Sequence, residues 1–75
     1  MDVKEYITRD PKIMFGKPVI KGTRIPVDLI LEKLALGETI EQLLLAYPKI
    51  NQVSINACLL YASLLIKNEV VYSAA

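Results

Sequence analysis

The pattern that most constrains the fold lies in the last third of the chain, where a helical repeat is apolar around most of its circumference. Its polar positions are Gln52, Asn56, Ser63 and Lys67, at spacings of four, seven and four residues, so they form one narrow stripe. A helix with this distribution is buried on most sides. A domain of this length buries only about 60% of the surface of its unfolded chain, so we expect a second chain to cover part of the helix.

Association with a second copy is the stabilising device that the composition leaves open. The 75 residues include a single cysteine, Cys58, and no histidine, so neither an intrachain disulfide nor a structural zinc site is expected. More than half of the residues are apolar (53%), which is more than one small interior can accommodate. We therefore predict a homodimer whose interface includes Val53, Leu60 and Leu64, and we expect no metal and no cofactor.

The net charge and the apolar runs narrow the range of partners. A net charge of +1 gives no strong field toward nucleic acid or a membrane surface, so any DNA binding would depend on local geometry. No apolar stretch reaches the ~18 residues of a membrane span, and the first ten residues do not resemble a signal peptide. Together with the free cysteine, these features lead us to expect a cytoplasmic protein without a membrane partner.

Residues 1–26 are expected to form an arm of short strands. The segment up to Val27 contains three of the four prolines and two of the three glycines, which disfavours helix. Two short β-type runs, at residues 5–8 and 18–21, are separated by turn residues, and Gly22 suits a tight turn after the second run. Because a lone hairpin is only marginally stable in water, the strands must pack on the helices or on a partner.

The remainder of the chain is predicted to be helical, which makes the protein a single, mostly α domain. A three-helix core is expected over residues 27–68, and residues 69–75 form a tail without a clear signal. The first helix is expected to begin at Pro26, since proline is tolerated in a first turn. Gly37 suits the position that follows the last turn of this helix.

A short turn is predicted between the second and third helices. Thr39 and Gln42 have the spacing of a capping box, and Pro48 ends the helix that they begin. Asn51 is a good N-cap for the third helix, which is expected to run to about Asn68. Two capped helices joined by about four residues have the geometry of a helix-turn-helix, in which the first residues of the second helix face the major groove of DNA.

The start of the third helix carries the candidate DNA contacts. The candidates are the polar side chains Lys49, Asn51, Gln52, Ser54 and Asn56. Asparagine and glutamine can pair with adenine through two hydrogen bonds, and the lysine could hold a phosphate near the turn. The alternative is structural: Asn51 is only a cap, while Gln52 and Asn56 are the solvated stripe of a buried helix. The residues alone leave both interpretations open.

A basic cluster is expected in the arm. Its members are Lys12, Lys17, Lys21 and Arg24, in thirteen residues without an acid. These cations could contact phosphates or an acidic partner. Alternatively, they form a solvated edge that discourages pairing with the strands of other molecules. For Arg24 we expect a structural role, in which it pairs with Asp28 or Glu32 of the following helix.

No set of residues indicates catalysis or nucleotide binding. The run from Gly16 to Thr23 resembles a phosphate-binding loop only superficially, because its Lys-Gly pair is in reverse order and Pro18 lacks the backbone N–H that such a loop uses. Without histidine, a positioned general base is hard to find. Cys58 lies among apolar neighbours and is expected to be a small, inert, buried side chain. We expect neither an enzyme nor a nucleotide-binding protein.

Two stretches of the chain resemble a bacterial family, the domain of unknown function 433. The first is the run GKPVIKGTRI at residues 16–25, and the second is GETI at residues 37–40 with the later Tyr47-Pro48; the similarity covers roughly residues 5 to 67. The resemblance implies a homeodomain-like helix-turn-helix core, frequent dimers and, for part of the family, a role as antitoxin beside a PIN-like nuclease toxin encoded by the adjacent gene. We therefore expect an antitoxin-like protein that pairs with such a toxin and binds its own promoter DNA as a dimer. The alternative is a protein-interaction module that does not bind DNA.

Overall fold

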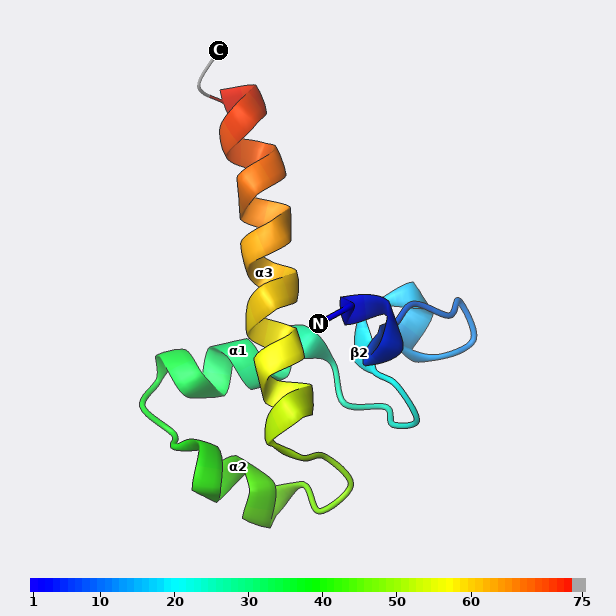
Figure 1. Ribbon diagram of the computed structural model, residues 1–75. Helices are drawn as coiled ribbons and strands as arrows, with labels where there is room; N and C mark the ends of the chain where they lie inside the picture. Colours follow the sequence, from blue (N-terminus) through cyan, green and yellow to red (C-terminus); the bar gives the residue numbers. More distant parts are fainter. Residues whose placement is uncertain (74–75) are drawn as a thin grey trace.

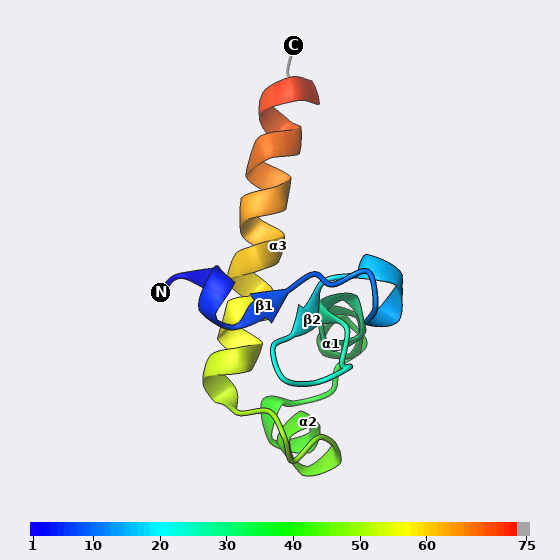
Figure 2. The same cartoon turned by 90° about the vertical axis from the view of Figure 1, so that its right-hand side faces the viewer.

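A two-stranded hairpin precedes three helices in the computed structural model, which describes residues 1–73 and, of these, the side chains of residues 1–68 (Figures 1 and 2). The elements in chain order are η1 (Val3–Glu5), β1 (Ile7–Thr8), η2 (Met14–Gly16), β2 (Val19–Ile20), α1 (Val27–Ala35), α2 (Ile40–Ala46) and α3 (Gln52–Ser73), where η denotes a 3-10 turn. The predicted fold class, mostly α with an N-terminal hairpin, is confirmed.

The hairpin is antiparallel and shorter than the sequence suggests. Ile7 lies opposite Ile20, and Thr8 lies opposite Val19. The first strand starts late because the Asp2 carboxylate accepts a hydrogen bond from the backbone N–H of Lys4 (3.0 Å) and starts η1 in its place. The isoleucines of both strands are buried in the core that the helices share, so the hairpin packs on the helices, one of the two expected arrangements.

A tight turn links the hairpin to α1. The backbone N–H of Thr23 donates to the carbonyl of Ile20 (3.0 Å), and Gly22 supplies the positive φ of +80° that the turn requires. Pro26 then pairs with Val19 and is the N-cap residue of α1, so the helix begins at the expected place.

The ends of α1 and α2 follow local capping rules. At Gly37, φ is +100°, and the N–H groups of Gly37 and Glu38 donate to the carbonyls of Leu34 and Lys33, which is the Schellman arrangement. The capping box at the start of α2 is present in full. Its two bonds run from the Gln42 backbone to the Thr39 hydroxyl (3.1 Å) and from the Thr39 backbone to the Gln42 side chain (2.9 Å).

The helix α3 is buried at its start and projects from the body beyond its middle. Ile55, Ala57 and Cys58 have no exposed surface and complete the core against α1, α2 and the hairpin. In both ribbon views the later turns of α3 extend past the other elements (Figures 1 and 2), and Ile66 is 58% exposed. The prediction of burial on most sides therefore holds only for the first half of this helix within one chain.

The helix α3 is also longer than predicted. It continues to Ser73, whereas its end was expected near Asn68. Neither proline nor glycine interrupts residues 52–73, so nothing in the chain forces an earlier end.

Candidate nucleic-acid interface

The turn between α2 and α3 is held in place by a backbone hydrogen bond and by one buried side chain. The backbone N–H of Ile50 donates to the carbonyl of Tyr47 (3.1 Å), and the Ile50 side chain is buried in the core. The turn thereby holds α2 against the start of α3, and both lie at the lower end of the molecule in Figure 1. This is the helix-turn-helix unit that the spacing of caps predicted.

Asn51 is the N-cap of α3, and Ser54 is its partner rather than a DNA contact. The side-chain oxygen of Asn51 accepts hydrogen bonds from the Ser54 backbone N–H (2.9 Å) and from the Ser54 hydroxyl (3.1 Å). Ser54 is only 7% exposed, so the prediction that it faces DNA is wrong. The cause is helical geometry: Ala57 and Cys58, three and four residues later, lie on the same face of α3, and that face packs into the core.

Four of the predicted contacts, all except Ser54, remain accessible at this end of the molecule. Lys49 is exposed on the turn, and Gln52 and Asn56 are exposed on α3. Because the two amides are four residues apart, they lie one above the other on one side of the helix. Asn51 uses its side-chain oxygen as the cap, which leaves its amide N–H groups as donors for another partner.

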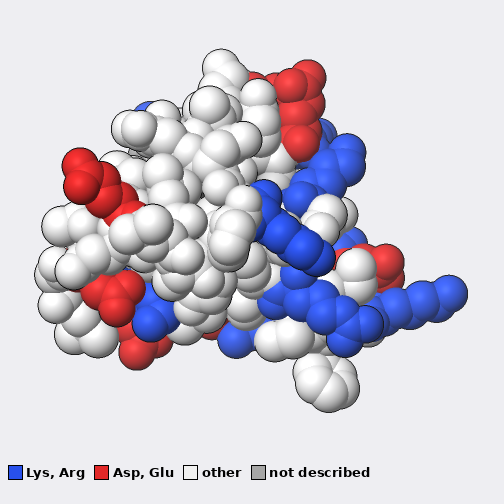
Figure 3. All heavy atoms as spheres, turned by 90° about the horizontal axis from the view of Figure 1, so that it is seen from below, with Lys and Arg blue, Asp and Glu red and all other residues white. Residues whose placement is uncertain are grey.

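The cations of the arm gather beside this end of the molecule. Seen from below (Figure 3), Lys and Arg side chains cluster toward the side that the hairpin occupies. The charged side chains on the opposite side are mostly Asp and Glu. All four predicted members of the cluster, at positions 12, 17, 21 and 24, are exposed, and Arg9 is a fifth exposed cation in the same segment. The net charge of the chain is small because its eight acids nearly balance its nine cations, not because cations are scarce.

The ion pair at the start of α1 involves Lys17 and not Arg24. The Lys17 ammonium lies 2.8 Å from the Asp28 carboxylate, and this hydrogen bond, with the attraction of the charges, lowers the pKa of Asp28. Lys17 is brought there because the carbonyl of the next residue, Pro18, accepts from the first N–H of α1 (2.9 Å). The prediction that Arg24 pairs with Asp28 or Glu32 is wrong for the part of the chain described here, in which Arg24 has no ion pair.

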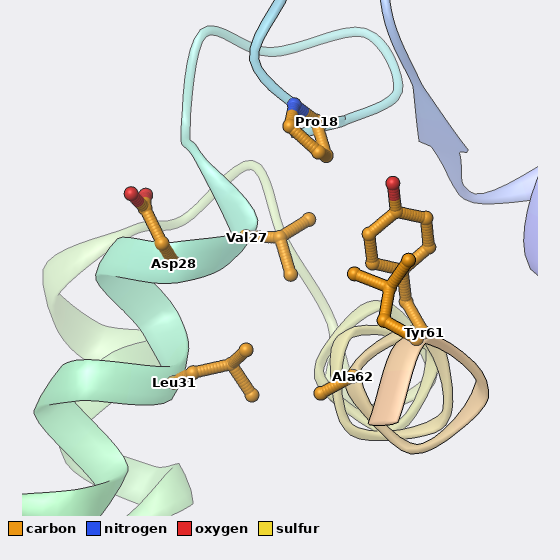
Figure 4. A pocket seen from close by; sticks show the side chains of 7 residues that line it. Pro18, Val27, Asp28, Leu31, Tyr61 and Ala62 are labelled. Carbon is orange, nitrogen blue, oxygen red and sulfur yellow. The ribbon is translucent and has the colours of Figure 1, made fainter. Parts of the chain in front are cut away.

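A small apolar groove lies between α1 and the middle of α3 (Figure 4). Its volume is about 150 Å³, and its lining consists of Pro18, Val27, Asp28, Leu31, Tyr61, Ala62 and Leu65. This volume is below the ~300 Å³ at which small-molecule sites begin. The lining is apolar apart from the Asp28 carboxylate and the Tyr61 hydroxyl, so the groove has the size and character to accept an apolar side chain rather than a substrate.

The structure offers no support for chemistry at the remaining candidate groups. Cys58 is buried, as expected, and burial raises the pKa of its thiol to about 11, which keeps it protonated and unreactive. Among the described side chains, those of residues 1–68, no three acidic, cysteine or histidine groups come together to hold a metal ion. Within residues 1–73, no helix combines the length and apolar character needed to cross a bilayer.

The three predicted interface residues lie along one side of α3. Val53 and Leu64 are exposed, and Leu60 between them is partly buried. Spacings of seven and four residues align them in a single stripe. The stripe is adjacent to the side of the helix that carries Gln52 and Asn56.

One exposed aromatic side chain was absent from the predicted site residues. Phe15 is 100% exposed and lies in η2, between two residues that also have positive φ. The sequence carries little signal for this conformation, because methionine and phenylalanine usually avoid it. Gly16 was the one indication in the sequence, because glycine readily adopts positive φ.

Two uncharacterized proteins are similar in sequence to this chain. The chain is 36% identical over 59 residues to an uncharacterized protein, y4eO, of Sinorhizobium fredii, a match that covers 79% of this chain and 27% of that protein, so the chain spans about a quarter of this relative. An uncharacterized protein of Archaeoglobus fulgidus is 71% identical over 24 residues, which are 32% of this chain and 67% of that protein.

A solved structure has the same fold. It is the crystal structure of a DUF433 member protein from Anabaena variabilis, with a TM-score of 0.78 and 25% identity, and the match covers 92% of this chain and 71% of that one. The model of the family described as protein of unknown function (DUF433) matches residues 7–62, so the chain belongs to the DUF433 family.

Proposed function

We propose that the protein is an antitoxin-like binding protein that contacts duplex DNA as a homodimer and pairs with a PIN-like nuclease. The observation that carries the DNA part is the helix-turn-helix at the lower end of the molecule, with Gln52 and Asn56 exposed on one side of α3. The amide at each position offers one donor and one acceptor, which can pair with the acceptor and the donor that adenine presents in the major groove. The cations beside them supply phosphate contacts.

Dimerisation is proposed through the projecting half of α3. Leu64, Leu65 and Ile66 are 42%, 49% and 58% exposed, and they follow one another on a part of the helix that lies beyond the other described elements. Consecutive residues point to different sides of a helix, so a second copy would bury Leu64 and part of its neighbours, which removes apolar surface from water at about 25 cal/mol per Å². A contact there leaves the start of α3 of each copy available for DNA, and paired half-sites are the usual result of such an arrangement.

The nuclease partner is proposed from the family resemblance. Its test is genomic: a reading frame for a PIN-like nuclease directly adjacent to the gene supports the pairing, and co-purification of the two products checks it. A gene without such a neighbour, whose product does not bind PIN-like nucleases, would contradict it. The DNA-binding proposal is independent of this outcome.

DNA binding is tested by fluorescence anisotropy with the DNA upstream of the gene. Gln52→Ala and Asn56→Ala should each weaken specific binding by about 5- to 150-fold, which corresponds to the ~1–3 kcal/mol of one bidentate base contact. Asn68→Ala is the matched control, because it removes an exposed amide about 24 Å along the same helix from position 52. No binding of the wild type at low salt, or equal effects of all three substitutions, would support a protein-interaction module instead.

The dimer is tested by sedimentation equilibrium at micromolar concentration. Leu64→Lys should shift the protein toward monomer, because it places a charge in the proposed apolar contact. Leu45→Lys is the control, since Leu45 is the same residue type and is 84% exposed but lies on α2. A monomeric wild type at these concentrations contradicts the proposal.

A further inference from the structure

In the loop around η2, an aromatic side chain is exposed to solvent and the backbone has an unfavourable conformation. Met14, Phe15 and Gly16 have φ angles of 50°, 58° and 81°, so three consecutive residues lie in the left-handed region. This conformation is uncommon for residues with a Cβ, and for bulky ones it is a clear outlier. Phe15 gains no packing in return, since its side chain is 100% exposed.

Hydrogen bonds at both ends of the loop hold this conformation. The Lys17 backbone donates to the carbonyl of Met14 (3.1 Å), and the Arg9 guanidinium donates through Nε to the carbonyl of Gly16 (3.2 Å). The Lys17 ammonium also ties the loop to α1 through Asp28. Strained backbone that the surroundings fix in this way is concentrated at binding sites, where it presents a group in a set position.

We propose that Phe15 is a DNA contact that inserts its ring at a base step of the minor groove, while the flanking cations hold the phosphates. Apolar side chains on basic elements act as wedges of this kind in minor-groove proteins. Arg9 and Lys12 lie on one side of Phe15 in the chain, and Lys21 and Arg24 lie on the other, beyond Lys17 with its ion pair to Asp28. The inference rests on the proposed DNA binding, because one duplex has to reach both the start of α3 and the hairpin side of the molecule.

The position and shape of the loop around η2 favour DNA over a membrane surface. In the ribbon views η2 lies on the hairpin side, level with α1 and above α2 (Figures 1 and 2), and basic side chains on that side are visible from below (Figure 3), so a duplex that meets both must extend from the start of α3 along the hairpin side. A membrane-binding surface would need a continuous apolar face, whereas η2 presents the Phe15 ring and the partly exposed Met14 with cations on either side in the chain. A single ring that enters a stack of bases needs no larger apolar area.

The test uses a fluorescein-labelled duplex of arbitrary sequence that carries 2-aminopurine, whose fluorescence rises when its base is unstacked. At low salt, the wild type should bind this duplex and raise the 2-aminopurine signal. Phe15→Ala should abolish the rise and weaken binding by about tenfold, in line with the loss of one aromatic–base contact. Phe15→Trp should retain both, and Leu36→Ala is the control, since Leu36 is a large exposed side chain at the end of α1.

A thermal melt separates binding from folding. Phe15→Gly should unfold at the wild-type temperature or a few degrees higher, because glycine adopts positive φ without strain. It should nevertheless bind as weakly as Phe15→Ala.

Each result decides for or against the wedge. A wild type that binds the duplex without a rise in 2-aminopurine signal, or a Phe15→Ala variant that binds as tightly as the wild type, overturns it while leaving contacts by Gln52 and Asn56 standing. Binding that needs Phe15 but not those amides supports the wedge and contradicts sequence reading by α3. Binding to phosphatidylserine vesicles without binding to DNA overturns it in favour of a membrane surface.

Discussion

Replacing Asn51 by alanine should destabilise the fold, because this side chain caps α3 and also satisfies a buried hydroxyl. Loss of an N-cap costs about 0.5–2 kcal/mol. Ser54 is 7% exposed, so removing the acceptor of its hydroxyl adds part of the ~1–3 kcal/mol of an unsatisfied buried group. The hydroxyl can turn to a backbone carbonyl one turn earlier, which offsets some of this. We expect a loss of about 2 kcal/mol in the free energy of unfolding.

Urea denaturation followed by far-UV circular dichroism measures this loss, with all proteins at one concentration because association also stabilises. Asn51→Asp should be close to the wild type, since it keeps the acceptor and places a negative charge at the helix N-terminus. The double variant with Ser54→Ala should lose less than the sum of the two single variants, because they share one interaction. An Asn51→Ala protein within about 0.5 kcal/mol of the wild type would refute the capping role.

Three further outcomes are expected. Gly37→Ala should lower the free energy of unfolding by about 1–2 kcal/mol, measured in urea, because φ is +100° there; an unchanged midpoint would contradict this. Cys58 should react with iodoacetamide at pH 8 far more slowly in the native state than in urea, since its pKa is raised to about 11 and it is buried; equal rates would refute its burial. The lowered folded-state pKa of Asp28 gives stability that is present above the unfolded value near 3.8 and is lost as pH falls through the folded value. Lys17→Met should abolish this loss of stability in acid. The loss is less than about 1 kcal/mol, because both side chains are at least half exposed. Measuring the free energy of unfolding as the pH is lowered checks the prediction.

The capping signals predicted the helix boundaries well because they act within four residues. Thr39 with Gln42, Asn51 and Gly37 each make the expected local bonds. Such bonds depend on residue type and spacing alone, so a single sequence suffices to place them. The end of α3 was the exception, since no terminating residue marks it.

The candidate site was only partly predictable because accessibility is a property of the assembled core. Gln52 and Asn56 are exposed as the polar stripe implied, whereas Ser54, two positions from each, turns inward to its cap and to the core. The ion-pair partner of Asp28 was also missed, because the hairpin brings Lys17 across to α1. A chain separation of eleven residues gives no sign of this contact.

By itself, the sequence determined the family, the mostly α class, the starts of all three helices and the excess of apolar side chains on the last of them. Those features follow from local backbone preferences and from the periodicity of apolar residues. Only the tertiary structure decided that the excess is concentrated in the projecting half of α3 and that the basic arm lies beside the helix-turn-helix. It also decided that Phe15 stands in solvent on a strained loop. These features depend on how the hairpin and helices pack in space, and no pattern within one element encodes that packing.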